Sequence, residues 1–331
     1  CDILVIFDHQ NLGRLCHPDV CVVPSGFPAA GALRKGSNSQ PMPEGDTVHK
    51  LAKVLHQGLL NQPLRRVELR GGIRPFAQPT RVESVRAQGK HCLITFDNGR
   101  TLRVHLGMHG SWHRYPQPWK NRGEVHLRLE TEKEVFVCLQ PKDVELLDAE
   151  ALARHPVLLG LGPDLLSTEE PDWDLVQHRA QKFCPPDRLL GEVLLDQRIA
   201  SGLGNVYKSE LCLLGPLPGG TGNPFCPLAG THPFSPIAVC SQEQLRDMFW
   251  RGRRLLQLNL GGWPRTTTYD ASRPLPGSQP RVWLYGREGK PCLRCSNTIH
   301  SRHQGLAARA TFWCPHCQPL GTWKEFSSKR G

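Results

Sequence analysis

The residues with the clearest chemical potential are Pro43 and Glu44, within the segment Met42-Pro43-Glu44-Gly45. This segment reads like the start of a mature protein, because a methionine before a small residue is usually removed. A terminal proline carries a free secondary amine, and an α-amino group with a pKa near ~8 is partly neutral at physiological pH. Glu44 would supply an acid or a base beside this nucleophile. We therefore predict an amine-based catalytic site, which requires that the first 42 residues are absent.

Four cysteines near the end of the chain form a second chemical group. They make two Cys-x-x-Cys pairs separated by 18 residues, namely Cys292, Cys295, Cys314 and Cys317. Four thiolates at this spacing suit one tetrahedral zinc ion with Zn–S bonds near ~2.3 Å. Because sulfur fills all four positions, the predicted zinc ion is structural and holds a segment too small to fold alone. Coincidence and redox-active pairs are the alternatives.

The composition is that of a globular protein with an excess of positive charge. Of the 331 residues, 39% are hydrophobic and 21% are charged, and the formal net charge is +11. Such a charge favours polyanionic partners, nucleic acid first, although a basic balance also serves solubility alone. The remaining cysteines are scattered, which suits a reducing cytosol better than a disulfide scaffold. No apolar run approaches the ~20 residues of a membrane span, so no membrane partner is expected.

The elements that must position Pro43 and Glu44 begin with a helix and continue as strands. Apolar residues at 48, 51, 52, 55 and 59 share one helical face, with Asp46 or Thr47 as a cap and Pro63 beyond the end. Asn98-Gly99 separates the strand-like runs 91–96 and 101–106, which predicts a hairpin. Residues 125–130 alternate in hydrophobicity as a strand does, and 135–139 form the next strand candidate, which can pair with them. We predict an antiparallel β-sandwich with a packed helix over residues 42–165.

The middle of the chain changes to helical patterns. Helix candidates at 189–196 and 205–213 flank a glycine-containing turn at 200–204, where the backbone can approach a ligand. The helix N-terminus there offers N–H groups to a phosphate, although an ordinary helical hairpin has the same pattern. We predict a helical domain over 166–280, with a Pro/Gly-rich insertion at 215–241, a basic amphipathic helix at 242–260 and a linker at 261–280. A zinc-finger β-hairpin at 281–320 and a tail at 321–331 complete an α+β fold.

Five segments in chain order resemble the formamidopyrimidine-DNA glycosylase/endonuclease VIII (Fpg/Nei) family of base-excision DNA glycosylases. Residues 42–45 look like the N-terminal signature of the family, 89–90 like its lysine segment, and 105–110 like its loop that probes the duplex. Residues 195–197 and 202–205 resemble its helix-two-turn-helix, and 285–318 resemble its zinc finger. The Pro-Glu-Gly start and the segment 141–147 look closer to the endonuclease VIII branch.

The resemblance implies catalytic roles by position. Pro43 would be the nucleophile that forms a Schiff base with C1′ of the damaged nucleotide, and Glu44 would donate the proton that opens the deoxyribose ring. A carboxyl in this role needs a raised pKa. Lys90 would be a proton donor linked to β-elimination. Arg309 would hold a phosphate at the lesion and assist δ-elimination.

The resemblance also implies DNA contacts and partners. Met108, with His109 beside it, would fill the hole left by the extruded base, and Asn205 would hold a phosphate. The expected partner is double-stranded DNA with damaged bases or abasic sites, bound by a monomer in the cytoplasm at the bacterial nucleoid, or in the nucleus of a eukaryote. The expected reaction removes oxidised bases and cuts the strand by β,δ-elimination. Pyrimidines are favoured as substrates, and oxidised purines are the alternative.

Residues 1–41 depart from the family pattern. They show no sustained periodicity, and we expect an extension that is disordered or not native. An amide-linked Pro43 has no lone pair to donate, so an attached extension would leave a DNA-binding protein of the same fold without lyase activity. An unrelated zinc-ribbon protein of transcription or translation is a third class, which the ordered upstream motifs disfavour.

Overall fold

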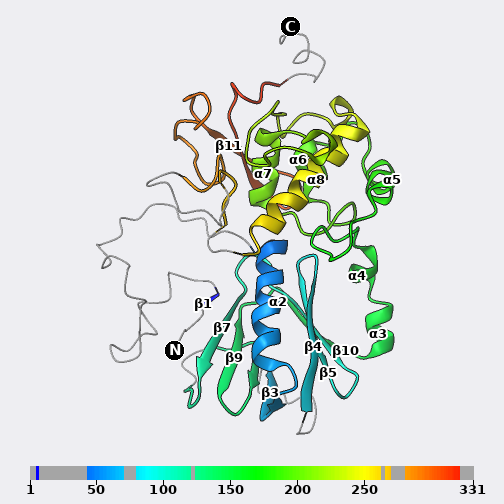
Figure 1. The fold of residues 1–331 in the computed structure, drawn as a ribbon, viewed down its shortest axis with the longest axis vertical. Helices are drawn as coiled ribbons and strands as arrows, with labels where there is room; N and C mark the ends of the chain where they lie inside the picture. The colour runs from blue at the N-terminus through cyan, green and yellow to red at the C-terminus, as the bar shows by residue number, and fades with distance from the viewer. Residues whose placement is uncertain are drawn as a thin grey trace, which may run out of the picture. The chain divides into compact units, whose positions relative to one another are not determined.

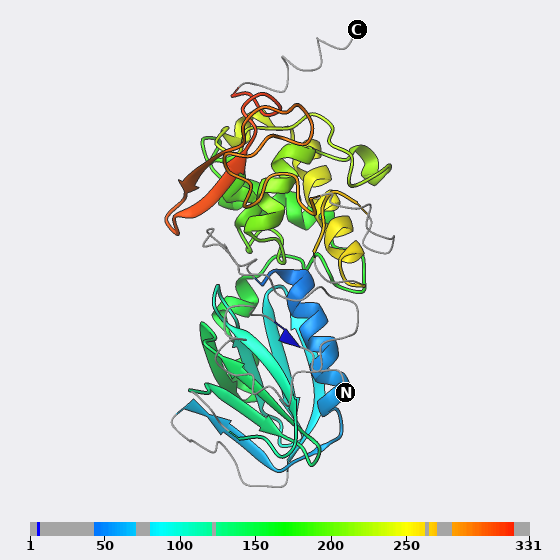
Figure 2. The ribbon, with the colours of Figure 1, turned by 90° about the vertical axis from the view of Figure 1, so that its left-hand side faces the viewer.

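The computed structural model describes residues 5–6, 43–70, 80–120, 124–261, 265–269 and 280–320. The chain divides into two compact units (Figures 1 and 2). The first unit comprises Cys1–Pro41, Leu51–Arg86 and His91–Ala153, and the second comprises Met42–Lys50, Ala87–Lys90 and Arg154–Gly331. The predicted extension 1–41, apart from Val5–Ile6, and the predicted tail 321–331 lie outside the described residues.

Two five-stranded sheets form the first unit and confirm the predicted β-sandwich (Figure 1). One sheet has the order β1 (Val5–Ile6), β7 (Ser111–Pro116), β9 (Glu134–Leu139), β8 (Leu127–Glu130) and β3 (Arg66–Leu69). The other has the order β10 (Asp143–Leu147), β6 (Thr101–His105), β5 (His91–Phe96), β4 (Thr80–Gln88) and β2 (Pro63–Leu64). The predicted hairpin is present, because β5 and β6 pair antiparallel with Thr95 opposite Thr101. Gly99 in its turn has φ +77°.

The helix α2 (Gly45–Leu59) buries the apolar face that the sequence predicts. Within the first unit it packs closely on β9, because a Cβ on Gly58 would lie 2.4 Å from the Phe136 ring. The predicted cap at Asp46 or Thr47 is wrong. The helix already begins at Gly45, and the Val48 N–H donates to Glu44 O at 3.0 Å, so Glu44 is the capping residue. The short helix α3 (Ala149–Ala153) follows β10.

Helices dominate the second unit. They are α4 (Pro156–Gly160), α5 (Trp173–Phe183), α6 (Leu190–Leu195), α7 (Asn205–Leu214) and α8 (Gln242–Leu258). Every residue of α7 is buried, so this helix forms the centre of the unit. The predicted basic face of the last helix is wrong in part. Arg251 and Arg253 are buried and donate to backbone carbonyl groups, including Gly215 O at 2.9 Å and Leu165 O at 2.8 Å.

The zinc-finger hairpin pairs β11 (His300–Gln304) with β12 (Arg309–Trp313), and β12 packs on α7 (Figure 2). The insertion 215–241 contains the short turns η2 (Pro218–Gly220) and η3 (Ile237–Val239). Two of its carbonyl groups fasten it to the zinc finger: Pro233 O accepts from Gln304 Nε2 at 2.9 Å, and Thr231 O accepts from Gln318 Nε2 at 3.1 Å. The insertion therefore supports the zinc finger through these two hydrogen bonds.

The predicted linker 261–280 is wrong for the part that the structure describes. Thr266, Thr267 and Thr268 are buried, and Thr266 O accepts a hydrogen bond from Asn259 Nδ2 at 2.8 Å. Residues 265–269 thus belong to the packed interior of the second unit. A run of hydroxyl and charged residues looks like a linker in sequence, but here buried partners satisfy its polar groups.

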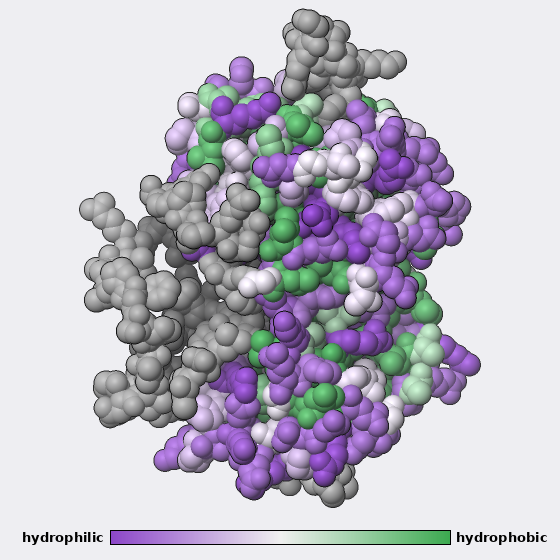
Figure 3. All heavy atoms as spheres, viewed as in Figure 1, coloured by the Kyte–Doolittle hydropathy of each residue, from purple (hydrophilic) through white to green (hydrophobic). Residues whose placement is uncertain are grey.

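No helix in the described ranges combines the length and apolar character that a membrane span requires. Hydrophobic and hydrophilic residues are interspersed on the face drawn in Figure 3. The cysteines within the described ranges are all free of disulfide bonds.

Candidate active site and zinc centre

The Glu44 carboxyl is held at the turn before α7. Its Oε2 accepts a hydrogen bond from the Gly204 N–H at 2.7 Å, and its Oε1 accepts one from the Val206 N–H at 2.7 Å. The residue is completely buried. Burial raises the pKa of Glu44 above its usual range, against the lowering effects of Arg265 and Lys90. A carboxyl with a raised pKa is suited to donate a proton near neutral pH.

Two glycines make room for this carboxyl. A Cβ on Gly204 would lie 2.5 Å from Glu44 Cδ, and a Cβ on Gly45 would lie 3.0 Å from Gly202 Cα. The Gly45 N–H also donates to Gly202 O at 2.8 Å. The close backbone approach that the sequence predicts at this turn is thus made by the chain's own Glu44 segment, and the Val206 N–H in the first turn of α7 is already occupied.

Pro43 and Lys90 lie in the same unit as Glu44. Pro43 is buried and directly precedes Glu44. Lys90 follows Gly89 in the turn between β4 and β5, where Gly89 has φ +57° and donates its N–H to Asp164 Oδ2 at 2.7 Å. Burial lowers the pKa of Lys90 to about 8, although the nearby Glu44 charge acts to raise it. An ammonium group with this pKa can exchange protons near neutral pH.

Asn205 and Lys208 connect α7 to the strand that carries Arg309. Asn205 Nδ2 donates to Ala310 O at 2.7 Å, and Lys208 Nζ donates to Thr311 Oγ1 at 2.5 Å. Both side chains are buried. The Asn205 amide therefore holds the hairpin, and its phosphate contact stays a prediction.

Positive charge gathers around Glu44. Lys90, Lys208 and Arg265 each interact electrostatically with its carboxyl, and the Arg309 charge acts to lower the pKa of both Lys90 and Lys208. An excess of cations over carboxylates is suited to a phosphate-bearing ligand. The arrangement can therefore combine a proton donor, amines of lowered basicity and attraction for a polyanion.

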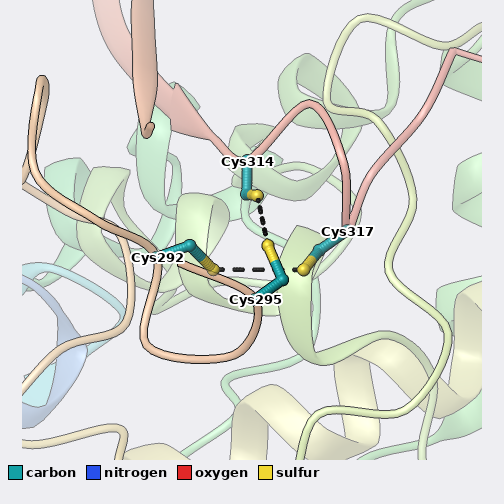
Figure 4. Close-up of side chains that lie close together, drawn as sticks. All are labelled: Cys292, Cys295, Cys314 and Cys317. Atoms are coloured by element: carbon teal, nitrogen blue, oxygen red, sulfur yellow. Dashed lines mark hydrogen bonds between the residues drawn. The ribbon is translucent and has the colours of Figure 1, made fainter. Parts of the chain in front are cut away.

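The four cysteines form one cluster, as predicted, with their sulfur atoms turned toward one another (Figure 4). Cys292 Sγ lies 3.9 Å from Cys317 Sγ, Cys295 Sγ lies 3.4 Å from Cys314 Sγ, and all four sulfurs are within 4.8 Å of one another. Zn–S bonds near ~2.3 Å place the sulfurs of a tetrahedron about 3.8 Å apart, so the cluster fits zinc. Gln318 Oε1 accepts from the Cys314 N–H at 2.9 Å and supports this loop.

Met108 and His109 belong to the first unit and are both exposed. They lie in a tight turn after β6, in which Gly107 has φ +68° and the Gly110 N–H donates to Leu106 O at 3.0 Å. An exposed methionine on a short, hydrogen-bonded turn is suited to insert its apolar side chain between the stacked groups of a ligand. Its role at an extruded base stays a prediction.

Sequence reasoning missed several largely buried charged residues that support the site. Arg265 pairs with Asp46, and Asp164 fixes the backbone beside Lys90. Glu210 accepts the N–H groups of Trp283, Leu284 and Tyr285 at distances of 2.7 to 2.9 Å, which anchors the segment before the zinc finger. The sequence does contain a polar run, 208–210, within α7. Its meaning depends on α7 having no exposed face, which is known only from the packing.

Comparisons with known proteins show which family the chain resembles. The family model for the formamidopyrimidine-DNA glycosylase N-terminal domain matches residues 42–146, and the zinc finger found in FPG and IleRS matches residues 289–320. The chain is 34% identical to the probable endonuclease 8 2 of Streptomyces coelicolor, over 84% of this chain and 94% of that protein. It is also 34% identical to the DNA-(apurinic or apyrimidinic site) lyase Nei2 of Mycolicibacterium smegmatis, over 84% of this chain and 99% of that protein.

Solved structures show the same fold. The MutM (FPG) protein of Thermus thermophilus has a TM-score of 0.63 and 26% identity, and the match covers 84% of this chain and 100% of that protein. The Lactococcus lactis glycosylase bound to DNA containing an abasic site has a TM-score of 0.65 and 19% identity, over 83% of this chain and 99% of that one. The class is thus the DNA-repair glycosylases with an Fpg-like fold. Within it, the chain belongs to the Fpg/Nei family, with endonuclease 8 proteins among its relatives.

Proposed function

We propose that this chain, when Pro43 carries a free amine, is a bifunctional DNA glycosylase and AP lyase that removes oxidised bases from double-stranded DNA. The observation that carries the proposal is the buried Glu44 carboxyl beside Pro43, held by two backbone N–H groups and surrounded by cations. The family model begins at Met42, which supports Pro43 as the working terminus.

The reaction follows from these groups. The neutral amine of Pro43 attacks C1′ of the damaged nucleotide, the glycosidic bond breaks, and the base leaves with a proton. Glu44 donates a proton to the ring oxygen as the C1′–O4′ bond opens, which leaves an iminium ion between Pro43 and C1′. The iminium ion accepts the electron pair of the C2′–H bond, so the 3′-phosphate is eliminated, and loss of a C4′ proton then expels the 5′-phosphate. Water releases the sugar fragment from Pro43.

Other residues would bind the DNA. We assign Arg309 and Asn205 to phosphates, Lys90 to proton transfer during β-elimination, and Met108 with His109 to the space left by the extruded base. One zinc ion on Cys292, Cys295, Cys314 and Cys317 would hold the hairpin without entering the reaction. The protein would act as a monomer, in the cytoplasm at a bacterial nucleoid or in a eukaryotic nucleus.

Borohydride trapping on a duplex with an abasic site tests the proposal. We expect a covalent adduct with protein that begins at Pro43 and none with the chain that retains residues 1–42, because an amide nitrogen cannot form the iminium ion. The E44Q variant of the Pro43-terminal protein should bind the duplex but trap at least ~100-fold more slowly. Binding without an adduct by the Pro43-terminal protein would instead indicate a DNA-binding protein of the same fold.

The preferred lesion follows from the resemblance to the endonuclease VIII branch. We propose oxidised pyrimidines as substrates. Cleavage of thymine glycol and 5-hydroxycytosine duplexes should exceed cleavage of an 8-oxoguanine duplex, and equal rates on all three would contradict the preference.

A further inference from the structure

The guanidinium of Arg265 meets the first turn of α2, although the two are 219 residues apart in sequence. Its Nε donates to Asp46 Oδ2 at 2.9 Å, and its Nη2 donates to Asp46 Oδ1 at 2.5 Å and to Thr47 Oγ1 at 3.0 Å. Two nitrogens therefore grip one carboxylate in the forked geometry that only arginine offers.

The third nitrogen of Arg265 faces the candidate proton donor. Nη1 is buried, has no hydrogen-bond acceptor among the described residues, and lies 3.7 Å from Glu44 Oε1. The guanidinium also lies over the Tyr207 ring of α7, with Cζ 5.0 Å from the ring centroid. Arg265 thus contacts the segment 44–47 on one side and α7 on the other.

We propose that Arg265 and Asp46 form a positioning pair, which fixes the Pro43–Glu44 segment against α7 and keeps one positive charge beside the Glu44 carboxyl. The inference rests on the proposed function for its consequence in catalysis, but the pair and its effect on Glu44 can be measured without activity. Neither residue touches the reacting atoms in the assigned mechanism, so both act through Glu44.

The charges in the pair have opposite effects on Glu44. Arg265 favours the ionised carboxyl and Asp46 disfavours it, while Asp46 keeps Arg265 in place. Among the described residues, the other titratable groups that interact with Glu44 are Lys90, Lys208, Tyr207 and Tyr285. Because these four are unchanged in variants of the pair, a shift in the titration of Glu44 reports on Arg265 and Asp46 themselves.

The test is a carboxyl-carbon NMR titration of Glu44 in the full chain labelled with [13C]glutamate, with the Glu44 signal assigned from E44Q. We expect R265M to raise the titration midpoint by roughly 1 unit or more, because an opposite charge within a few ångströms has been removed. R265K, which keeps a charge but not the fork, should raise it less. D46N keeps an amide oxygen that can accept from Arg265 but removes the neighbouring negative charge, so it should lower the midpoint.

A matched control separates electrostatics from loss of packing. R253M removes another buried arginine of the same unit, whose Nη1 donates to Leu165 O at 2.8 Å, and it should destabilise the protein without moving the Glu44 midpoint. An unchanged midpoint in both R265M and D46N would overturn the inference, as would a shift of the same sign in both. Failure of the Pro43-terminal protein to trap on DNA would contradict the proposed function alone, because the titration needs no substrate.

Discussion

At the residue scale, the site depends on a glycine that leaves room for a buried carboxyl group. Glu44 keeps a carboxyl in a dry interior because two backbone N–H groups reach both of its oxygens. Gly204 makes this possible, since any side chain there would occupy the position of the carboxyl. The sequence showed that glycine was needed at this turn but not what it makes room for, because the partner lies 160 residues away.

G204A tests this steric argument. The added Cβ would lie 2.5 Å from both Glu44 Cγ and Cδ, so the carboxyl must move by about an ångström. A displacement of that size lowers rates by ~100-fold when a catalytic group is involved, and we expect such a loss in borohydride trapping by the Pro43-terminal protein. G160A is the control, because a Cβ on Gly160 meets nothing within 4 Å and should leave the rate intact. Full activity in G204A would contradict the placement of Glu44.

At the scale of elements, periodicity and turn residues predicted α2, the β5–β6 hairpin, α6, α7 and α8 with ends close to those observed. The failures occur where polar residues are buried. The stretch at 265–269 resembles a linker, yet Thr266 hydrogen-bonds Asn259, and Arg251 of α8 points inward to carbonyl groups of the insertion. A prediction from local sequence patterns places charged side chains in water. Hydrogen-bond partners that are distant in sequence can instead stabilise such side chains in the interior.

The zinc finger gives a prediction at this scale. C314S should abolish zinc binding and weaken DNA affinity by tenfold or more, because the hairpin that carries Arg309 has little core of its own without the metal. Zinc content by atomic absorption and DNA binding by fluorescence anisotropy are the measurements. C226S is a matched control, since Cys226 is exposed and lies outside the cluster. Retained zinc at one ion per chain in C314S would contradict the four-cysteine site.

At the scale of the whole molecule, the second unit collects the catalytic candidates from three separate stretches, Met42–Lys50, Ala87–Lys90 and Arg154–Gly331. Ordered motifs predicted that Pro43, Glu44, Lys90 and Arg309 belong together, and four of the missed residues, Arg265, Asp164, Lys208 and Glu210, lie in the same unit. Motifs mark residues whose chemistry is distinctive. The residues of supporting ion pairs belong to no distinctive motif. Their contribution to the site depends on burial, which no local sequence pattern encodes.

Burial of these charges should also make stability depend on pH, and Lys208 gives the clearest case. Burial lowers its pKa from 10.5 to about 8 in the folded protein. Below pH 8 Lys208 is protonated in both the folded and the unfolded state, so folding carries the full cost of burying its charge. Between about pH 8 and 10.5 the unfolded state binds more protons than the folded state, so stability rises with pH. Relative to K208M, the unfolding free energy of the wild type should therefore increase by up to ~3 kcal/mol across this window, measured by urea denaturation. The exposed Lys53 provides a control, K53M, which should run parallel to the wild type. A constant difference between wild type and K208M would mean that Lys208 is not charged and buried in the folded state.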